Sequence, residues 1–164
     1  MRLARQLLAA SILEDDPMER DELVMGILEE KKAARRCAAE ILAWVPAAAP
    51  FPAGALDEYV RRKLLLKPED MRERSLIKLA KISVMRMSSL PRESAWMADA
   101  KDCAGATSSL TKKVLLMMAV EKEMGISMPP EASADIETME DLAAQVALLR
   151  GEKEGVHEPS GCSG

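Results

Sequence analysis

Apolar residues recur every three to four positions along most of this 164-residue chain, and this spacing limits the fold to helices packed on one another. The spacing is clearest over residues 17–45, where one helix face would carry Val24, Ile27, Leu28, Ala34, Ala38, Ile41 and Val45. Asp16, Pro17 and Glu19 form a typical start for such a helix. Helix-forming residues dominate the composition, and aromatic residues supply only 2%, which disfavours a β-sheet protein. We therefore expect an all-α fold.

Proline and glycine residues divide the rest of the sequence into further helices. Pro46, Pro50, Pro52 and Gly54 predict a loop over residues 46–55. Other helices are expected over residues 2–14, 56–66, 68–89, 110–124 and 138–149. Residues 88–109 form a long polar segment. Gly125 is placed to end the helix expected over residues 110–124. From residue 151 onward, Gly, Glu, Lys and Ser predominate, so residues 151–164 are expected to be a disordered tail.

The residue types that usually carry catalysis are too few or too scattered to form an active site. The single histidine, His157, lies in the polar tail, so any Ser–His or Cys–His pair would depend on it. The three cysteines, Cys37, Cys103 and Cys162, lie far apart, which argues against a disulfide framework or a zinc site. We expect a protein that is not an enzyme and holds no metal.

The apolar stretch near the N-terminus is short and runs into Glu14-Asp15-Asp16, so we expect a cytoplasmic protein rather than a signal peptide. The net charge is −4, and no apolar run approaches the ~18 residues of a membrane span. Residues 60–92 contain ten Lys or Arg and three Asp or Glu. Residues 119–150 contain only two Lys or Arg and seven Asp or Glu. Either the basic segment binds an acidic partner, or the two segments attract each other within one fold. Nucleic-acid binding is not expected, because the basic segment lacks interleaved aromatic residues and a helix-turn-helix pattern.

A more specific pattern follows the predicted helix over 110–124. The helix ends in Gly125-Ile126-Ser127-Met128-Pro129; Ile136 lies in the next loop, and Thr138-Met139-Glu140-Asp141 starts the last helix. From Val114 to Val146 this order resembles acyl carrier proteins without a gap. In that family a helix ends in Gly-Ile-x-Ile-Pro, a loop holds a buried Ile, and Thr-Val-x-Asp begins the final helix. The resemblance implies a small carrier-protein-like helical bundle over residues 67–150, preceded by a helical extension over residues 1–66.

The same spacing has a physical meaning of its own. Four residues are expected to form the inner stripe of the helix before Gly125: Val114, Met117, Met118 and Val120. Four more are expected to close the bundle: Ile126, Met128, Ile136 and Val146. Thr138 would cap the last helix, and Asp141 would complete a capping box. Lys112 is expected to be exposed.

The resemblance also implies a serine, at the start of the second carrier helix, that holds 4′-phosphopantetheine covalently. Such a serine needs an exposed hydroxyl at a helix N-terminus, where free backbone N–H groups favour the phosphate. Three alignments of residues 104–110 compete. Counting back from Gly125 without a gap selects Leu110, which cannot be modified. Matching the Ser-Leu pair selects Ser109 and requires one inserted residue relative to the family. Matching the Gly-x-Thr-Ser pattern selects Ser108 and requires two inserted residues. Ser109 is the preferred attachment site and Ser108 the second, and capping alone is the other role open to both.

Two functions of different classes follow. The resemblance implies an acyl carrier protein-like protein that holds an acyl or aminoacyl group on a phosphopantetheine arm. Its partners would be a phosphopantetheinyl transferase and the enzymes that use the cargo. Thr111-Lys112-Lys113 stand where the family usually carries acidic residues, so the recognition surface would have inverted charge. The alternative is a non-catalytic helical adaptor or regulatory subunit, with an unmodified bundle and a basic stripe from Arg61 to Arg92. In either case the N-terminal extension would serve for docking or for forming a homodimer.

Overall fold

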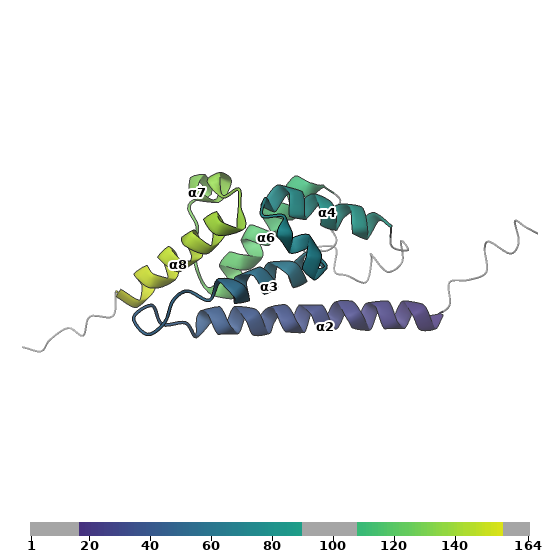
Figure 1. The fold of residues 1–164 in the computed structure, drawn as a ribbon, viewed down its shortest axis with the longest axis horizontal. Helices are drawn as coiled ribbons and strands as arrows, with labels where there is room; N and C mark the ends of the chain where they lie inside the picture. The colour runs from purple at the N-terminus through teal and green to yellow at the C-terminus, as the bar shows by residue number, and fades with distance from the viewer. Residues whose placement is uncertain (1–16, 90–107, 156–164) are drawn as a thin grey trace, which may run out of the picture.

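The structure is a computed structural model that describes residues 17–89 and 108–155. Its elements are α2 (Pro17–Leu42), α3 (Ala53–Lys63), the 3₁₀ helix η1 (Pro68–Arg72), α4 (Leu76–Ser88), α6 (Ser109–Met124), α7 (Pro130–Asp135) and α8 (Met139–Gly155). Helix α2 runs along one side of the molecule, and the other helices lie on one side of it (Figure 1). The all-α prediction is confirmed for the described residues. The predicted helix over 2–14 lies outside them.

One hydrophobic core joins the N-terminal helices α2 and α3 to the helices over residues 67–150. Its buried residues come from α2 and α3, from α4 and α6, and from α8 and the turns before it: Ala34, Ala38, Ile41, Leu56, Tyr59, Val60, Leu64, Leu76, Leu79, Leu116, Met117, Val120, Met124, Ile126, Met128, Ile136, Met139, Leu142 and Val146. A small second cluster packs Ile27 of α2 against Met87 of α4. Because the apolar faces of both parts meet in one core, neither is buried without the other.

Helices α2 and α3 form a hairpin whose connection is held by its aromatic residues. The rings of Trp44 and Phe51 pack edge to face with centroids 5.0 Å apart, and Trp44 Nε1 donates to the carbonyl of Ala49 at 2.9 Å. Helix α3 covers residues 53–63 rather than the predicted 56–66. The loop predicted over residues 46–55 therefore ends at residue 52. The chain leaves α3 at Leu65, whose φ of 53° is in the left-handed region.

The predicted helix over 68–89 is wrong at its start. Residues 68–72 form the 3₁₀ helix η1, and α4 begins only at Leu76. The interruption has a tertiary cause: Leu76 N donates to the carbonyl of Glu137 at 2.9 Å, and Met139 N donates to the carbonyl of Arg74 at 2.9 Å. These two bonds link the start of α4 to the start of α8. A continuous helix would use the same backbone groups internally.

Helix α8 continues to Gly155, beyond its predicted end near residue 149 and into the segment predicted to be disordered. Contacts with distant parts of the chain stabilise its last turns. The Arg150 guanidinium donates to the carbonyl of Leu42 at 2.9 Å, and the Lys153 ammonium donates to the carbonyl of Gly125. Residues 156–164 lie outside the described part of the chain.

Candidate functional site: the first turn and outer face of helix α6

Ser108 is the N-cap of α6. Its backbone is extended, with φ −116° and ψ 140°, and its hydroxyl oxygen accepts a hydrogen bond from the Thr111 backbone N–H at 3.2 Å. The same hydroxyl lies 3.2 Å from Thr111 Oγ1, and the Ser108 carbonyl accepts from the Lys112 N–H at 2.9 Å. This is the geometry in which serine satisfies a backbone donor that the helix itself leaves unpaired. The capping role is therefore occupied by Ser108.

Ser109 is the first residue inside the helix, and its hydroxyl is available for chemistry. The residue is partly exposed, and its hydroxyl makes no hydrogen bond within the described part of the chain. Leu110, the position selected by the ungapped alignment, is 65% exposed. The three aligned positions therefore differ: Ser108 caps the helix, Ser109 has an uncommitted hydroxyl, and Leu110 presents an apolar side chain to solvent.

The start of α6 is suited to a negatively charged group. Its first turn contains no acidic side chain, and Lys113 follows in the second turn, partly exposed. The backbone N–H groups and the helix dipole give this end a partial positive charge.

The outer face of α6 is apolar. Leu110, Val114 and Met118 follow one another at intervals of four residues and are 65%, 50% and 57% exposed. We call these three residues the α6 stripe. The prediction that Val114 and Met118 point inward is wrong, and so is the prediction that Lys112 is exposed, because the buried face instead carries Lys112, Leu116, Met117, Val120 and Met124. A row of exposed apolar side chains beside the candidate serines is typical of a surface that contacts another protein.

The far end of α6 has the buried turn that the sequence predicts. Gly125 ends the helix in the left-handed conformation, with φ 61°. Ile126 and Met128 then enter the core, and the Glu121 carboxylate accepts from the Met128 N–H at 2.6 Å. Ile136 and Val146 are also buried, as the spacing predicts. The local geometry therefore explains why glycine and alternating apolar residues stand in this turn.

The capping box at the start of α8 is confirmed. The Thr138 N–H donates to the Asp141 carboxylate at 2.9 Å, and the Asp141 N–H donates to Thr138 Oγ1 at 3.1 Å. These bonds from Thr138 hold the pKa of Asp141 below its ordinary value. The box orients the last helix toward the core shared with α6.

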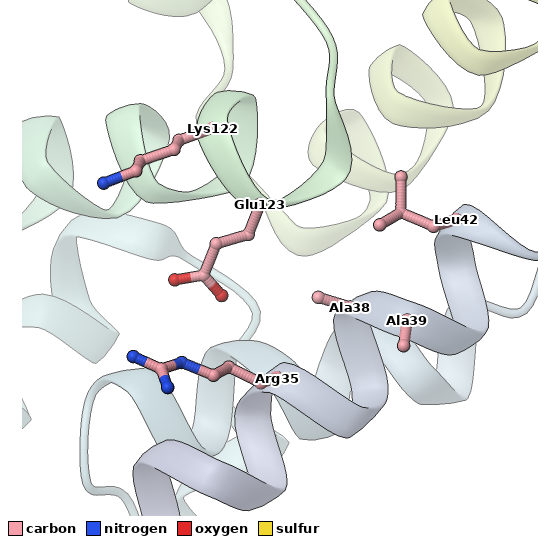
Figure 2. Close-up of a pocket in the computed structure, with 6 residues that line it drawn as sticks. All are labelled: Arg35, Ala38, Ala39, Leu42, Lys122 and Glu123. Atoms are coloured by element: carbon pink, nitrogen blue, oxygen red, sulfur yellow. The ribbon is translucent and has the colours of Figure 1, made fainter.

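Sequence reasoning missed an open groove between α2 and α6. It has a volume of about 280 Å³ and is lined by Arg35, Ala38, Ala39, Leu42, Lys122 and Glu123. Figure 2 shows the Glu123 carboxylate and the Arg35 guanidinium extending toward one another across this groove. Glu123 itself pairs with Lys63 of α3, at 2.5 Å between Oε1 and Nζ. The two neighbouring alanines of α2, which leave room between the helices, are the sequence feature that could have indicated it.

The basic segment is used largely inside the fold. Among the described residues, six cations of this segment form ion pairs, among them Lys63 with Glu123 and Arg74 with Glu140. Arg74 also donates to Asp57, with N–O distances of 2.9 and 3.2 Å. Within the described part of the chain, only the pairs with Glu123 and Glu140 join the basic segment to the acidic segment over 119–150, as the second interpretation expects, and the other paired cations contact carboxylates outside that segment. The pairs leave less charge for an acidic partner.

Other sequence candidates give no site in the described residues. Cys37 is partly buried, and this burial raises the pKa of its thiol, so it is poorly suited to act as a nucleophile. Cys103 and His157 lie outside the described residues. Within residues 17–89 and 108–155, no group of His, Cys, Asp and Glu side chains could hold a metal ion. No helix in those ranges combines the length and the hydropathy that crossing a membrane requires.

Comparison of the chain with models of protein families, with curated proteins and with solved structures finds no match. The first turn of α6 is therefore interpreted from its own residues.

Proposed function

We propose that this protein is an acyl carrier protein-like protein, without catalytic activity of its own, that acts in the cytoplasm. It would hold an acyl or aminoacyl group as a thioester on a 4′-phosphopantetheine arm and present the group to partner enzymes. The observation that carries the proposal is the uncommitted Ser109 hydroxyl at the start of α6, directly after a serine that already caps the helix. The buried turn after Gly125 and the capping box of α8 support it, because both follow the carrier-like pattern.

Ser109 is preferred over Ser108 for a physical reason. Attachment converts the serine hydroxyl into a phosphate ester, which removes the O–H donor and adds a charged group to the oxygen. At Ser108 this oxygen accepts the Thr111 N–H, so modification would disturb the cap. At Ser109 the cap would stay intact, and the phosphodiester would lie beside the positive end of the helix.

The α6 stripe and Lys113 suggest how partner enzymes would recognise the protein. Leu110, Val114 and Met118 form an apolar row that begins one residue after Ser109, so a partner that covers this row also reaches the arm. Lys113 lies next to the row, and no acidic side chain is present in the first turn. We therefore expect a partner surface that combines an apolar groove with acidic residues.

The decisive experiment is an intact-mass measurement. The protein is incubated with coenzyme A and a broad-specificity phosphopantetheinyl transferase, and the wild type is compared with Ser109→Ala and Ser108→Ala. The proposal expects one phosphopantetheine group on the wild type, none on Ser109→Ala, and one on Ser108→Ala. Circular dichroism of each variant shows whether α6 still forms. Modification lost only in Ser108→Ala would move the attachment site to Ser108.

A wild type that never gains mass would favour the adaptor function instead. Leu110 supports this alternative, because the ungapped alignment places it at the modified position and its side chain is exposed rather than buried. The protein would then bind partners through the unmodified bundle. Leu110→Ser provides a further test: it places a hydroxyl at the aligned position. If Leu110→Ser is modified when the wild type is not, the ungapped alignment is correct and the natural chain is a non-catalytic adaptor or regulatory subunit.

A further inference from the structure

One side of α2, next to its buried face, is exposed along the length of the helix for which side chains are described. The other helices pack along one face of α2 (Figure 1), and the last part of the exposed side borders the groove between α2 and α6 (Figure 2). Seven exposed residues follow one another at alternating intervals of four and three, and we call them the α2 stripe: Asp21, Met25, Leu28, Lys32, Arg35, Ala39 and Leu42. This interval is the heptad repeat by which one helix packs along another.

The apolar members of the stripe are unusually exposed for a heptad position. Met25, Leu28 and Leu42 are 56%, 44% and 42% exposed, whereas Ile27, Ala34 and Ile41 on the inner face are buried. Helix α2 thus has two apolar faces, and only one of them packs in the core. A second helix along the α2 stripe would remove the exposed side chains from water.

Charge is divided along α2 in a way that identifies this second helix. Residues 17–30 contain five acidic residues and one basic residue, whereas residues 31–42 contain four basic residues and one acidic residue. A second α2 in parallel would place like charges side by side. A second α2 in the opposite direction would place each acidic half beside a basic half. The helix is therefore electrostatically complementary to an antiparallel copy of itself.

The groove between α2 and α6 supports the antiparallel arrangement. It lies at the basic half of the stripe and includes Arg35, Ala39 and Leu42 (Figure 2). The acidic half of a second α2, with Met25 and Leu28, would lie along it. The alanine floor allows close approach of a helix, and Arg35 and Lys122 at the sides would meet acidic side chains.

We propose that the protein forms a homodimer with twofold symmetry, in which the α2 stripes of two copies pack antiparallel. The acidic half of each stripe contacts the basic half and the groove of the other copy. This interface does not involve the start of α6, so the proposal stands independently of the carrier function.

Charge exchange within the stripe and beside it tests the pairing. Sedimentation velocity on the full chain measures the mass against concentration, and the wild type is expected to reach the mass of two 17.9-kDa chains. Asp21→Lys, Glu22→Lys and Glu29→Lys together change the net charge of residues 17–30 from −4 to +2, and Lys32→Glu, Arg35→Glu and Arg36→Glu together change that of residues 31–42 from +3 to −3. Each triple variant should be a monomer, because both contacts in the dimer become repulsive. All six substitutions together should restore the dimer, since the halves are again opposite in charge. The six also keep a cation and a carboxylate at positions 29 and 32, whose side chains pair at 2.9 Å in the wild type.

A matched pair of apolar variants tests the stripe itself. Leu28→Asp should raise the dimer dissociation constant by at least about tenfold, because it places a carboxylate in the interface. Met85→Asp, at an exposed methionine on α4 outside the stripe, should leave the dissociation constant unchanged. Helix content is followed by circular dichroism in every variant. A wild type that stays monomeric at all concentrations overturns the proposal. If removal of residues 1–16 then produces a dimer, those residues cover the stripe in place of a second copy.

Discussion

Replacing Ile126 with alanine tests the turn that places α6 against the rest of the core. Ile126 is 6% exposed and follows Gly125 directly. The substitution removes three carbon groups, which corresponds to about 2.4 kcal/mol of lost transfer free energy. The cavity left in the packed core adds to this loss, so we expect the free energy of unfolding to fall by about 3 kcal/mol. The Ile126 N–H still reaches the Glu121 carbonyl, at 3.1 Å in the wild type, because alanine keeps this donor.

The assay is equilibrium denaturation followed by far-ultraviolet circular dichroism, with Val114→Ala as the control. Val114 is 50% exposed, so its truncation loses only about 0.8 kcal/mol of burial. Alanine is the better helix former by roughly 0.6 kcal/mol, which offsets most of that loss. The control should therefore stay within about 0.5 kcal/mol of the wild type. Similar losses in the two variants, or a loss below about 1 kcal/mol for Ile126→Ala, would show that α6 presents a different face to the core.

Three further predictions concern single side chains. Ser108→Ala should lower the free energy of unfolding by about 1 kcal/mol through loss of the cap, whereas Ser109→Ala should leave thermal unfolding nearly unchanged. Lys112→Ala should destabilise the protein by about 1–3 kcal/mol in a denaturant titration, because its side chain is fully buried in α6; a neutral result would place it at the surface. The hydrogen bond from Arg86 lowers the pKa of Asp70 in the folded protein. The stabilisation by this pair is therefore complete above the ordinary pKa of an aspartate and is lost as pH falls through the lowered pKa. Denaturation across an acidic pH series should therefore show a weaker pH dependence for Asp70→Asn, and an unchanged slope would contradict the pair.

Local signals in the sequence were sufficient for most helices and for the turn after α6. Proline and glycine placed the break after α2, and the left-handed Gly125 ended α6 at the predicted residue. The pair Thr138 and Asp141 predicted the start of α8, because a capping box involves only neighbouring residues. These features depend on a few consecutive side chains and their backbone, so a sequence contains nearly all the information they need.

Features that depend on distant segments could not be predicted in the same way. The break before α4 exists because Arg74 and Leu76 form backbone bonds with the start of α8, more than sixty residues away. The inner face of α6 was misassigned because apolar residues occur on both of its faces, and spacing alone does not show which one the other helices cover. The candidate site is affected by the same difficulty: spacing located the start of α6, but only the structure shows that Ser108 caps it and Ser109 does not.

The core that the α2–α3 hairpin shares with α8 has a consequence for biosynthesis. The hairpin is made before α8, and its inner residues Leu56, Tyr59 and Val60 are buried in a core that also contains Met139 and Leu142 of α8. A nascent chain therefore exposes these apolar side chains until α8 has left the ribosome. Such a chain would need protection by a chaperone until then, because exposed apolar surface promotes aggregation. A ribosome that stops within α8 would release a chain whose hairpin has no partner to pack on.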